Sequence, residues 1–245
     1  ELLILENFHN SENLKSIADH IYESETLNSN DVLLLAGFFF RLKDFEKFNE
    51  IIRTKLSNQF DKDFIIKNFS FHNNIFYKTP NLHTVLASKI YNNSTLNNNQ
   101  NQKSYSFLYQ KILLEMSLYL CPNLDAAKYS LAELYDLEKT NKRALKKLES
   151  ISLGSFFFLP SSLKKLSIIN TLGKKDDYKD LLFKYKKRWP KNKFLLYRLA
   201  AYYKSRKKYF QSIKIYQKII NIYGKNDQNL FLYASNLDKI GKWNE

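Results

Sequence analysis

Apolar residues in the second half of the chain recur at the spacing of an α-helix. Over 193–226, steps of three and four residues place large side chains on one face of a helix, and a second such run follows after a short polar stretch. The apolar positions are Leu196, Leu199, Tyr203, Tyr216 and Ile219. A small residue, Ala200 or Ser212, stands within each run. The pattern predicts two helices that pack closely through their apolar faces.

The same pattern repeats along the chain at a fixed interval. The step from Ala132 to Ala200 is twice the step from Ala200 to Ala234. Other residue classes share the longer of these two steps: Pro122 and Pro190, Tyr135 and Tyr203, Gly173 and Gly241, Ala144 and Ser212, Leu148 and Tyr216. The shorter step is the period. A period of about 34 residues is typical of a repeated helix–turn–helix unit, in which each pair of helices covers the bare apolar face of its neighbour.

The period and these residues resemble the tetratricopeptide-repeat (TPR) family, and within it the long multi-repeat bacterial proteins. The resemblance implies an all-α fold, a right-handed α-solenoid of antiparallel helix pairs. It is specific over 125–245, where it predicts repeats at 125–158, 159–192 and 193–226 and a truncated repeat at 227–245.

The N-terminal half follows the pattern less regularly. We expect degenerate TPR-like helix pairs over 1–59 and an irregular connector over 60–79. A TPR-like pair follows over 80–124, interrupted by an Asn-rich loop at 92–104 that has the composition of a disordered segment. Two phenylalanine triplets, 38–40 and 156–158, cannot turn all their rings to one helix face. We expect them to pack against neighbouring repeats, or to leave one ring of each exposed.

The composition offers little for chemistry. With 5 Gly, 4 Pro and 1 Cys, the chain has no glycine-rich phosphate loop and no disulfide framework. The four histidines, His9, His20, His72 and His83, form no metal-ligand spacing. We therefore expect no enzyme, no cofactor and no metal.

The location of the protein stays open. No run of 18 apolar residues is present, so no transmembrane segment is expected. The chain starts at Glu1 rather than Met, which suggests an excised piece. It is compatible with the cytoplasm or, if an upstream signal was removed, with the periplasm or cell envelope. The sequence does not determine the oligomeric state.

TPR resemblance also suggests where a protein partner binds. In that family the first helix of each pair lines a concave groove, and the matching positions here are mostly aromatic or basic. The expected groove residues are Tyr129, Glu133, Phe194, Tyr197, Arg198, Lys204 and Phe231. The expected function is a non-catalytic scaffold that binds a peptide or protein in this groove. The alternative is that the aromatic side chains only cover the core.

Charge supports a second hypothesis. The chain has a net charge of +15, but 139–225 alone holds 24 Lys/Arg against 4 Asp/Glu. Such a stretch could bind an anionic partner, whether nucleic acid, an anionic membrane surface or an acidic protein. Its candidate basic patch is Lys184, Lys186, Lys187, Arg188, Arg206, Lys207 and Lys208. Cations near helix C-termini are also favourable for the helix dipole, so a purely structural role stays open.

Overall fold

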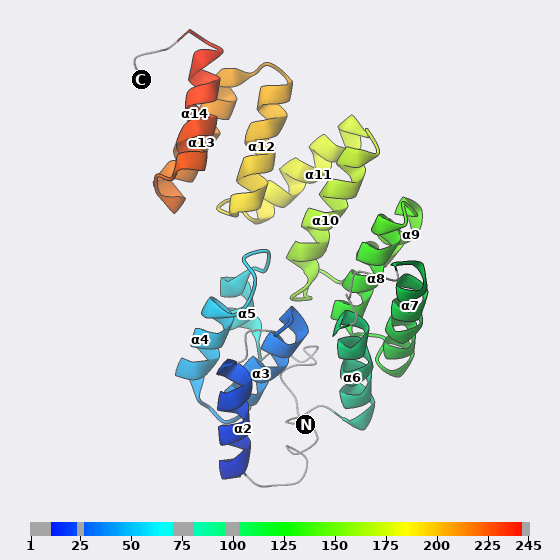
Figure 1. The fold of residues 1–245 in the computed structure, drawn as a ribbon. Helices are drawn as coiled ribbons and strands as arrows, with labels where there is room; N and C mark the ends of the chain where they lie inside the picture. The colour runs from blue at the N-terminus through cyan, green and yellow to red at the C-terminus, as the bar shows by residue number, and fades with distance from the viewer. Residues whose placement is uncertain (1–10, 24–26, 71–80, 97–102, 242–245) are drawn as a thin grey trace. The chain divides into compact units, whose positions relative to one another are not determined.

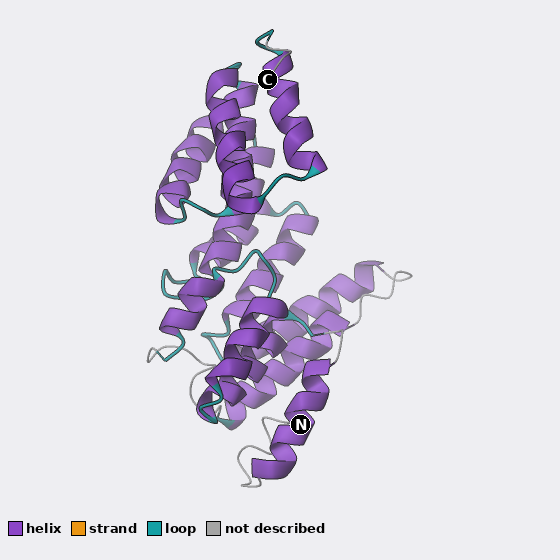
Figure 2. Cartoon of the chain, turned by 90° about the vertical axis from the view of Figure 1, so that its left-hand side faces the viewer, coloured by secondary structure: helices purple, strands orange, loops and turns teal. Residues whose placement is uncertain are grey.

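The structure is a computed structural model, and it describes residues 11–23, 27–70, 81–96 and 103–241. These residues form helices and connecting loops without a strand (Figures 1 and 2). The chain packs as two compact units, Glu1–Ser161 (unit 1) and Ser162–Glu245 (unit 2).

The helices follow one another with short connections. Unit 1 contains α2 (Ser11–Glu23), α3 (Ser29–Arg41), α4 (Phe45–Thr54), α5 (Lys62–Asn68), α6 (Leu82–Leu96), α7 (Lys103–Leu120), α8 (Asp125–Leu137) and α9 (Asn141–Glu149). Helix α10 (Phe158–Thr171) begins at the end of unit 1, and unit 2 continues with α11 (Lys175–Arg188), α12 (Lys193–Ser205), α13 (Tyr209–Tyr223) and α14 (Asp227–Asp238). The closest packing joins α3 with α4, α6 with α7, α8 with α9, and α12 with α13. The predicted all-α fold of antiparallel helix pairs is confirmed.

The turn that follows the first helix of a pair recurs at the period of the sequence pattern. Lys139, Gly173, Lys207 and Gly241 are evenly spaced, and all have φ between 57° and 71°, the left-handed conformation that ends a helix. At each of the first three turns, the next backbone N–H donates to a carbonyl five residues earlier. An additional turn of the same form lies at Lys43. The backbone therefore repeats with the period predicted from the side chains, although the predicted repeat boundaries themselves stay a prediction.

Small residues mark the points where paired helices cross. In unit 2, Ala200 of α12 and Ser212 of α13 are fully buried, and the Ser212 hydroxyl donates to the Ala200 carbonyl oxygen at 3.0 Å. Ala132 and Ala144 are fully buried on α8 and α9. Around the crossing in unit 2, Leu196, Tyr216 and Ile219 form the core. A larger side chain at the small positions would push the helices apart.

Phenylalanine rings from separate segments meet inside unit 1. Phe69 stacks on Phe156 with ring centroids 5.6 Å apart, and Phe60 meets Phe157 edge-on at 5.0 Å. Phe38 and Phe39 are buried and Phe40 is half-buried. Both triplets thus pack in the interior, and none of their rings is exposed.

Two expected irregular stretches are partly helical, so those predictions were wrong there. Helix α5 forms inside 60–79, because Asp61 caps it through the Phe64 N–H at 3.0 Å and Ile65 is buried. Helices α6 and α7 extend into 92–104. Residues 71–79 of the first stretch and 97–102 of the second lie outside the described residues.

Helix α6 extends because Asn92 is held by another helix of unit 1. Its side-chain amide donates to an Asp31 carboxylate oxygen at 2.6 Å, and Asn28 donates to the other oxygen at 2.7 Å. Burial is the largest influence on Asp31 and raises its pKa above the ordinary 3.8, although the bond from Asn92 opposes it.

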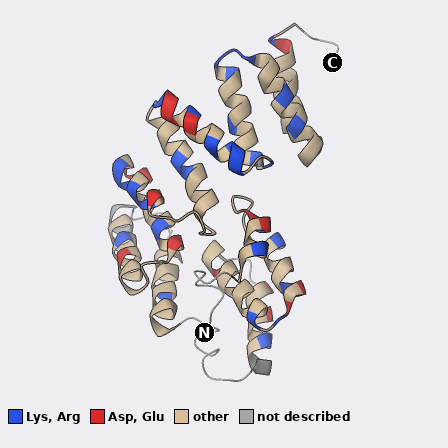
Figure 3. Ribbon diagram, turned by 180° about the vertical axis from the view of Figure 1, so that it is seen from behind, with Lys and Arg blue, Asp and Glu red and all other residues tan. Residues whose placement is uncertain are grey.

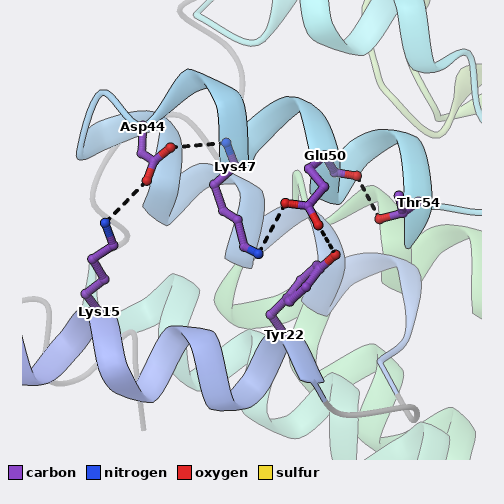
Figure 4. Close-up of polar contacts among 6 residues, drawn as sticks. All are labelled: Lys15, Tyr22, Asp44, Lys47, Glu50 and Thr54. Carbon is purple, nitrogen blue, oxygen red and sulfur yellow. Dashed lines mark hydrogen bonds and ion pairs between the residues drawn. The ribbon is translucent and has the colours of Figure 1, made fainter.

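Polar contacts join α2 to α4 (Figure 4). The Tyr22 hydroxyl donates to Glu50, and the Lys47 ammonium lies 3.7 Å from the centre of the Tyr22 ring. Lys15 lies 3.5 Å from Asp44, whose other carboxylate oxygen caps α4 by accepting from the Lys47 N–H. These surface contacts orient α2, but they contribute little to stability.

Candidate partner-binding surfaces

Helices α12 and α14, each the first helix of its pair, lie side by side in unit 2. The Tyr197 hydroxyl on α12 donates to the side-chain oxygen of Asn229 on α14, and the Lys204 ammonium donates to the Ser235 hydroxyl at 3.0 Å. These bonds join the two helices near both ends of α12. Asn229 is fixed in turn, because it is fully buried and donates to the Gly224 carbonyl at 3.0 Å.

The surface on these two helices, here called the α12–α14 face, consists of Phe194, Tyr197, Arg198, Ala201, Lys204 and Phe231. Phe231 is 71% exposed and Phe194 is 38% exposed, while Ala201 on α12 is also exposed. Arg198 is half-buried, and its side chain comes from the same side of α12. The face therefore offers one exposed aromatic ring on each helix and, on α12, a guanidinium one helical turn from the small, exposed Ala201.

Tyr197 is part of the support of this face. Partial burial raises its pKa, so the hydroxyl stays a neutral donor to Asn229 at physiological pH. The Lys193 ammonium lies 5.9 Å from the Tyr197 ring and 5.7 Å from the Tyr223 ring. Tyr197 and Lys204 thus already have intramolecular partners, and the freer side chains are Phe194 and Phe231.

In unit 1 the two remaining predicted groove residues lie on α8. Tyr129 is half-buried, and its ring lies 6.1 Å from that of buried Phe157. Burial and the neighbouring Glu133 carboxylate both raise the Tyr129 pKa. Close by, the Tyr91 hydroxyl is 3.4 Å from Ser130, and burial raises the pKa of Tyr91 to about 12. Tyr129 therefore behaves as a residue that covers the core, the alternative considered for these tyrosines.

The predicted basic patch occupies two places instead of one. Lys184, Lys186, Lys187 and Arg188 lie at the C-terminal end of α11, which leads into the start of α12. Arg206, Lys207 and Lys208 lie past the opposite end of α12 (Figure 3). A 13-residue helix separates them, which corresponds to about 20 Å. All seven are exposed except Lys186, which is half-buried.

Net positive charge is nonetheless confined to unit 2. Residues 162–245 hold 21 Lys/Arg and 6 Asp/Glu, a net +15, whereas residues 1–161 hold 18 of each. Between 181 and 226 there are 14 Lys/Arg and no Asp or Glu. The α12 helix lies within this stretch, so the α12–α14 face stands in a positive field.

The described residues contain no group of three His, Cys, Asp or Glu side chains placed to hold a metal ion. Cys121 is buried, and His20 and His83 are exposed, while His9 and His72 lie outside the described residues. Among the described helices, none is long and apolar enough to cross a bilayer.

The paired helices, the periodic recurrence of the turn and the small residues at the crossings define a TPR-like helical-repeat fold. A scan against protein-family models and a search of curated proteins both find no match. Among solved structures, the chain is 13% identical to PilW, a type IV pilus biogenesis factor, over 88% of this chain and 87% of that one, with a TM-score of 0.47. It is 14% identical to a chain of the APC/C hetero-tetramer Cut9–Hcn1, over 96% of this chain and 48% of that one, with a TM-score of 0.46. Neither likeness says what this chain binds.

Proposed function

We propose that the protein is an interaction scaffold, and that a partner segment with apolar and acidic side chains binds along the α12–α14 face. The observation that carries this proposal is that Phe194 on α12 and Phe231 on α14 are both exposed. Phe194 also lies within a stretch that has no acidic residue. Exposed aromatic rings with an arginine nearby are typical of the residues that dominate protein interfaces.

The support of the face favours binding without rearrangement. Tyr197 and Lys204 hold α12 to α14, so the two phenylalanine rings project from a fixed pair of helices. A surface that is ordered before binding loses less conformational entropy when a partner docks. Arg198 is the side chain on the face suited to a partner carboxylate.

The alternative is an anionic partner bound by the basic patch alone. Because its two groups of cations lie at opposite ends of α12, one compact acidic group could not contact both. An extended polyanion could, and the experiment below separates it from a peptide.

The test is selection of peptides from a random display library by the full 245-residue chain. We expect selected peptides to combine aliphatic or aromatic residues with Asp or Glu. The Phe194→Ala, Phe231→Ala double variant should weaken their binding by about 100-fold, since each ring is expected to contribute about 1–2 kcal/mol. The matched control is Phe210→Ala, an exposed ring on α13 of the same unit. Arg198→Glu should shift the selection towards basic peptides.

Two results would overturn the proposal. Peptides that bind the double variant as well as the wild type would place the site elsewhere. A chain that selects no peptide but binds single-stranded RNA, with affinity lost on substitution of Lys207 and Lys208, would favour the polyanion.

A further inference from the structure

Helix α7 in unit 1 has an unusual outer face. Five of its large apolar side chains are between 49% and 87% exposed: Leu108, Tyr109, Ile112, Met116 and Tyr119. Four of them, from Tyr109 to Tyr119, follow one another at steps of three, four and three residues. This is the spacing of a helix seam that packs against another helix. We call Tyr109, Ile112, Met116 and Tyr119 the α7 stripe.

The second helices α9 and α13 carry no such row of apolar residues, although α13 exposes the large ring of Phe210. The outer face of α9 exposes Lys142, Arg143 and Lys146, and that of α13 exposes Gln211, Lys214 and Gln217. An outer helix face that meets only water is normally polar in this way. The α7 stripe is therefore not what the fold requires of that position.

Both charged residues of α7 between Leu108 and Leu120 pair with residues at the end of α8 and on α9. The Lys111 ammonium lies 2.7 Å from Glu138, and Glu115 lies 3.0 Å from the Lys147 ammonium on α9. These two ion pairs leave the stripe without a charge at its centre. A charged centre would disfavour helix–helix contact, so its absence suits the burial of Ile112 and Met116.

We infer that the α7 stripe is the contact surface between two copies of this chain. Its residues are arranged symmetrically, with a tyrosine at each end and Ile112 and Met116 in the middle. If two α7 helices cross antiparallel about a two-fold axis at the level of Leu114, whose own side chain is buried in the core, Ile112 of one copy meets Met116 of the other, and Tyr109 meets Tyr119. A two-fold contact needs this self-complementarity, in which residue i meets j and j meets i.

The exposed area agrees with a dimer of moderate strength. The five side chains expose on the order of 600 Å², at the upper end of what a typical monomer leaves in one apolar patch. A stable interface buries about 800 Å² on each partner, and the rims of the stripe can supply the remainder. The tyrosine hydroxyls at the ends can stay in water while their rings are buried.

Sedimentation equilibrium of the full chain at concentrations up to about 200 μM tests the dimer. We expect a monomer–dimer equilibrium in the micromolar range. Ile112→Glu with Met116→Glu would put four carboxylates into the contact and weaken dimerisation at least ~100-fold. Phe210→Glu, a similarly exposed apolar residue on α13, should leave it unchanged, and circular dichroism checks that each variant folds.

Disulfide trapping tests the register even if the double variant fails to fold. In a Cys121→Ser background, Tyr109→Cys mixed with Tyr119→Cys should form a mixed disulfide. Neither variant alone should cross-link, because the same residue on two antiparallel copies is about 15 Å apart along the axis, beyond disulfide reach. A wild-type chain that is monomeric at the highest concentration overturns the inference, as does a dimer that survives Ile112→Glu with Met116→Glu or Tyr109→Cys that cross-links to itself.

Discussion

Lys139 and Lys207 hold the same left-handed backbone conformation as Gly173 and Gly241. A side chain in this conformation is strained by about 1–2 kcal/mol, because its Cβ approaches the neighbouring backbone. Glycine has no Cβ and avoids that contact, so the four turns have the same backbone conformation but differ in strain energy. The two glycines can be recognised in the sequence as turn residues. The two lysines cannot, because nothing about a lysine indicates that its backbone adopts the left-handed conformation.

Replacing Lys139 by glycine should therefore stabilise the protein. We expect Lys139→Gly to raise the free energy of unfolding by about 0.5–1 kcal/mol, the relief of strain less the larger entropy of the unfolded glycine. Urea denaturation measures it. The control is Lys142→Gly, within helix α9, which should lower stability by a similar amount. Destabilisation by both changes would mean that the Lys139 side chain makes a contact worth more than its strain.

At the scale of the helices, the small-residue positions carried most of the predictive information. Ala200 and Ser212 indicated a close crossing, and the structure places them in contact. Helix α5 has too few residues to show a period, and it depends on the neighbouring Phe69 packing against Phe156, so the sequence pattern could not reveal it. The α7 stripe could not be predicted for another reason. Apolar residues at helical spacing predict a face that packs against something, but they do not show whether that is the rest of the same chain or another molecule. For the same reason the sequence could not separate Tyr129, which covers core, from Phe231, which is exposed.

The link between α3 and α6 should respond to pH. Because the folded state raises the pKa of Asp31, it binds a proton more tightly than the unfolded chain. The stability that this group contributes is complete below pH 3.8 and is lost as pH rises through the raised pKa. Relative to Asp31→Asn, which does not titrate, the wild type should thus become less stable across that interval. Denaturation with guanidinium at a series of pH values measures the difference between the two, and a difference that moves in favour of the wild type with rising pH would contradict the prediction.

At the scale of the whole molecule, the division into two units should be visible during unfolding. Both tryptophans of the chain, Trp189 and Trp243, lie in the sequence of unit 2, whereas helices in both units contribute to circular dichroism. Leu196→Ala removes a fully buried side chain from the core of unit 2 and should cost it about 2–5 kcal/mol.

We expect this variant to lower the urea midpoint of tryptophan fluorescence and to leave part of the circular dichroism change at the wild-type midpoint. Ile52→Ala, in the core of unit 1, is the reverse control and should leave the fluorescence midpoint nearly unchanged. If both probes shift together in both variants, the two units unfold as one cooperative body.

The absence of any acidic residue between 181 and 226 has a consequence for how an acidic partner would bind. Fourteen cations in a stretch that contains no Asp or Glu concentrate small anions from the solvent around α12 and α13. A partner carboxylate that docks there sends such ions back into bulk solution. Part of the driving force is then the entropy of mixing of the released ions, which is largest in dilute buffer and vanishes as the salt concentration approaches that near the protein. Binding would then exchange small anions from the solvent for the carboxylates of the partner.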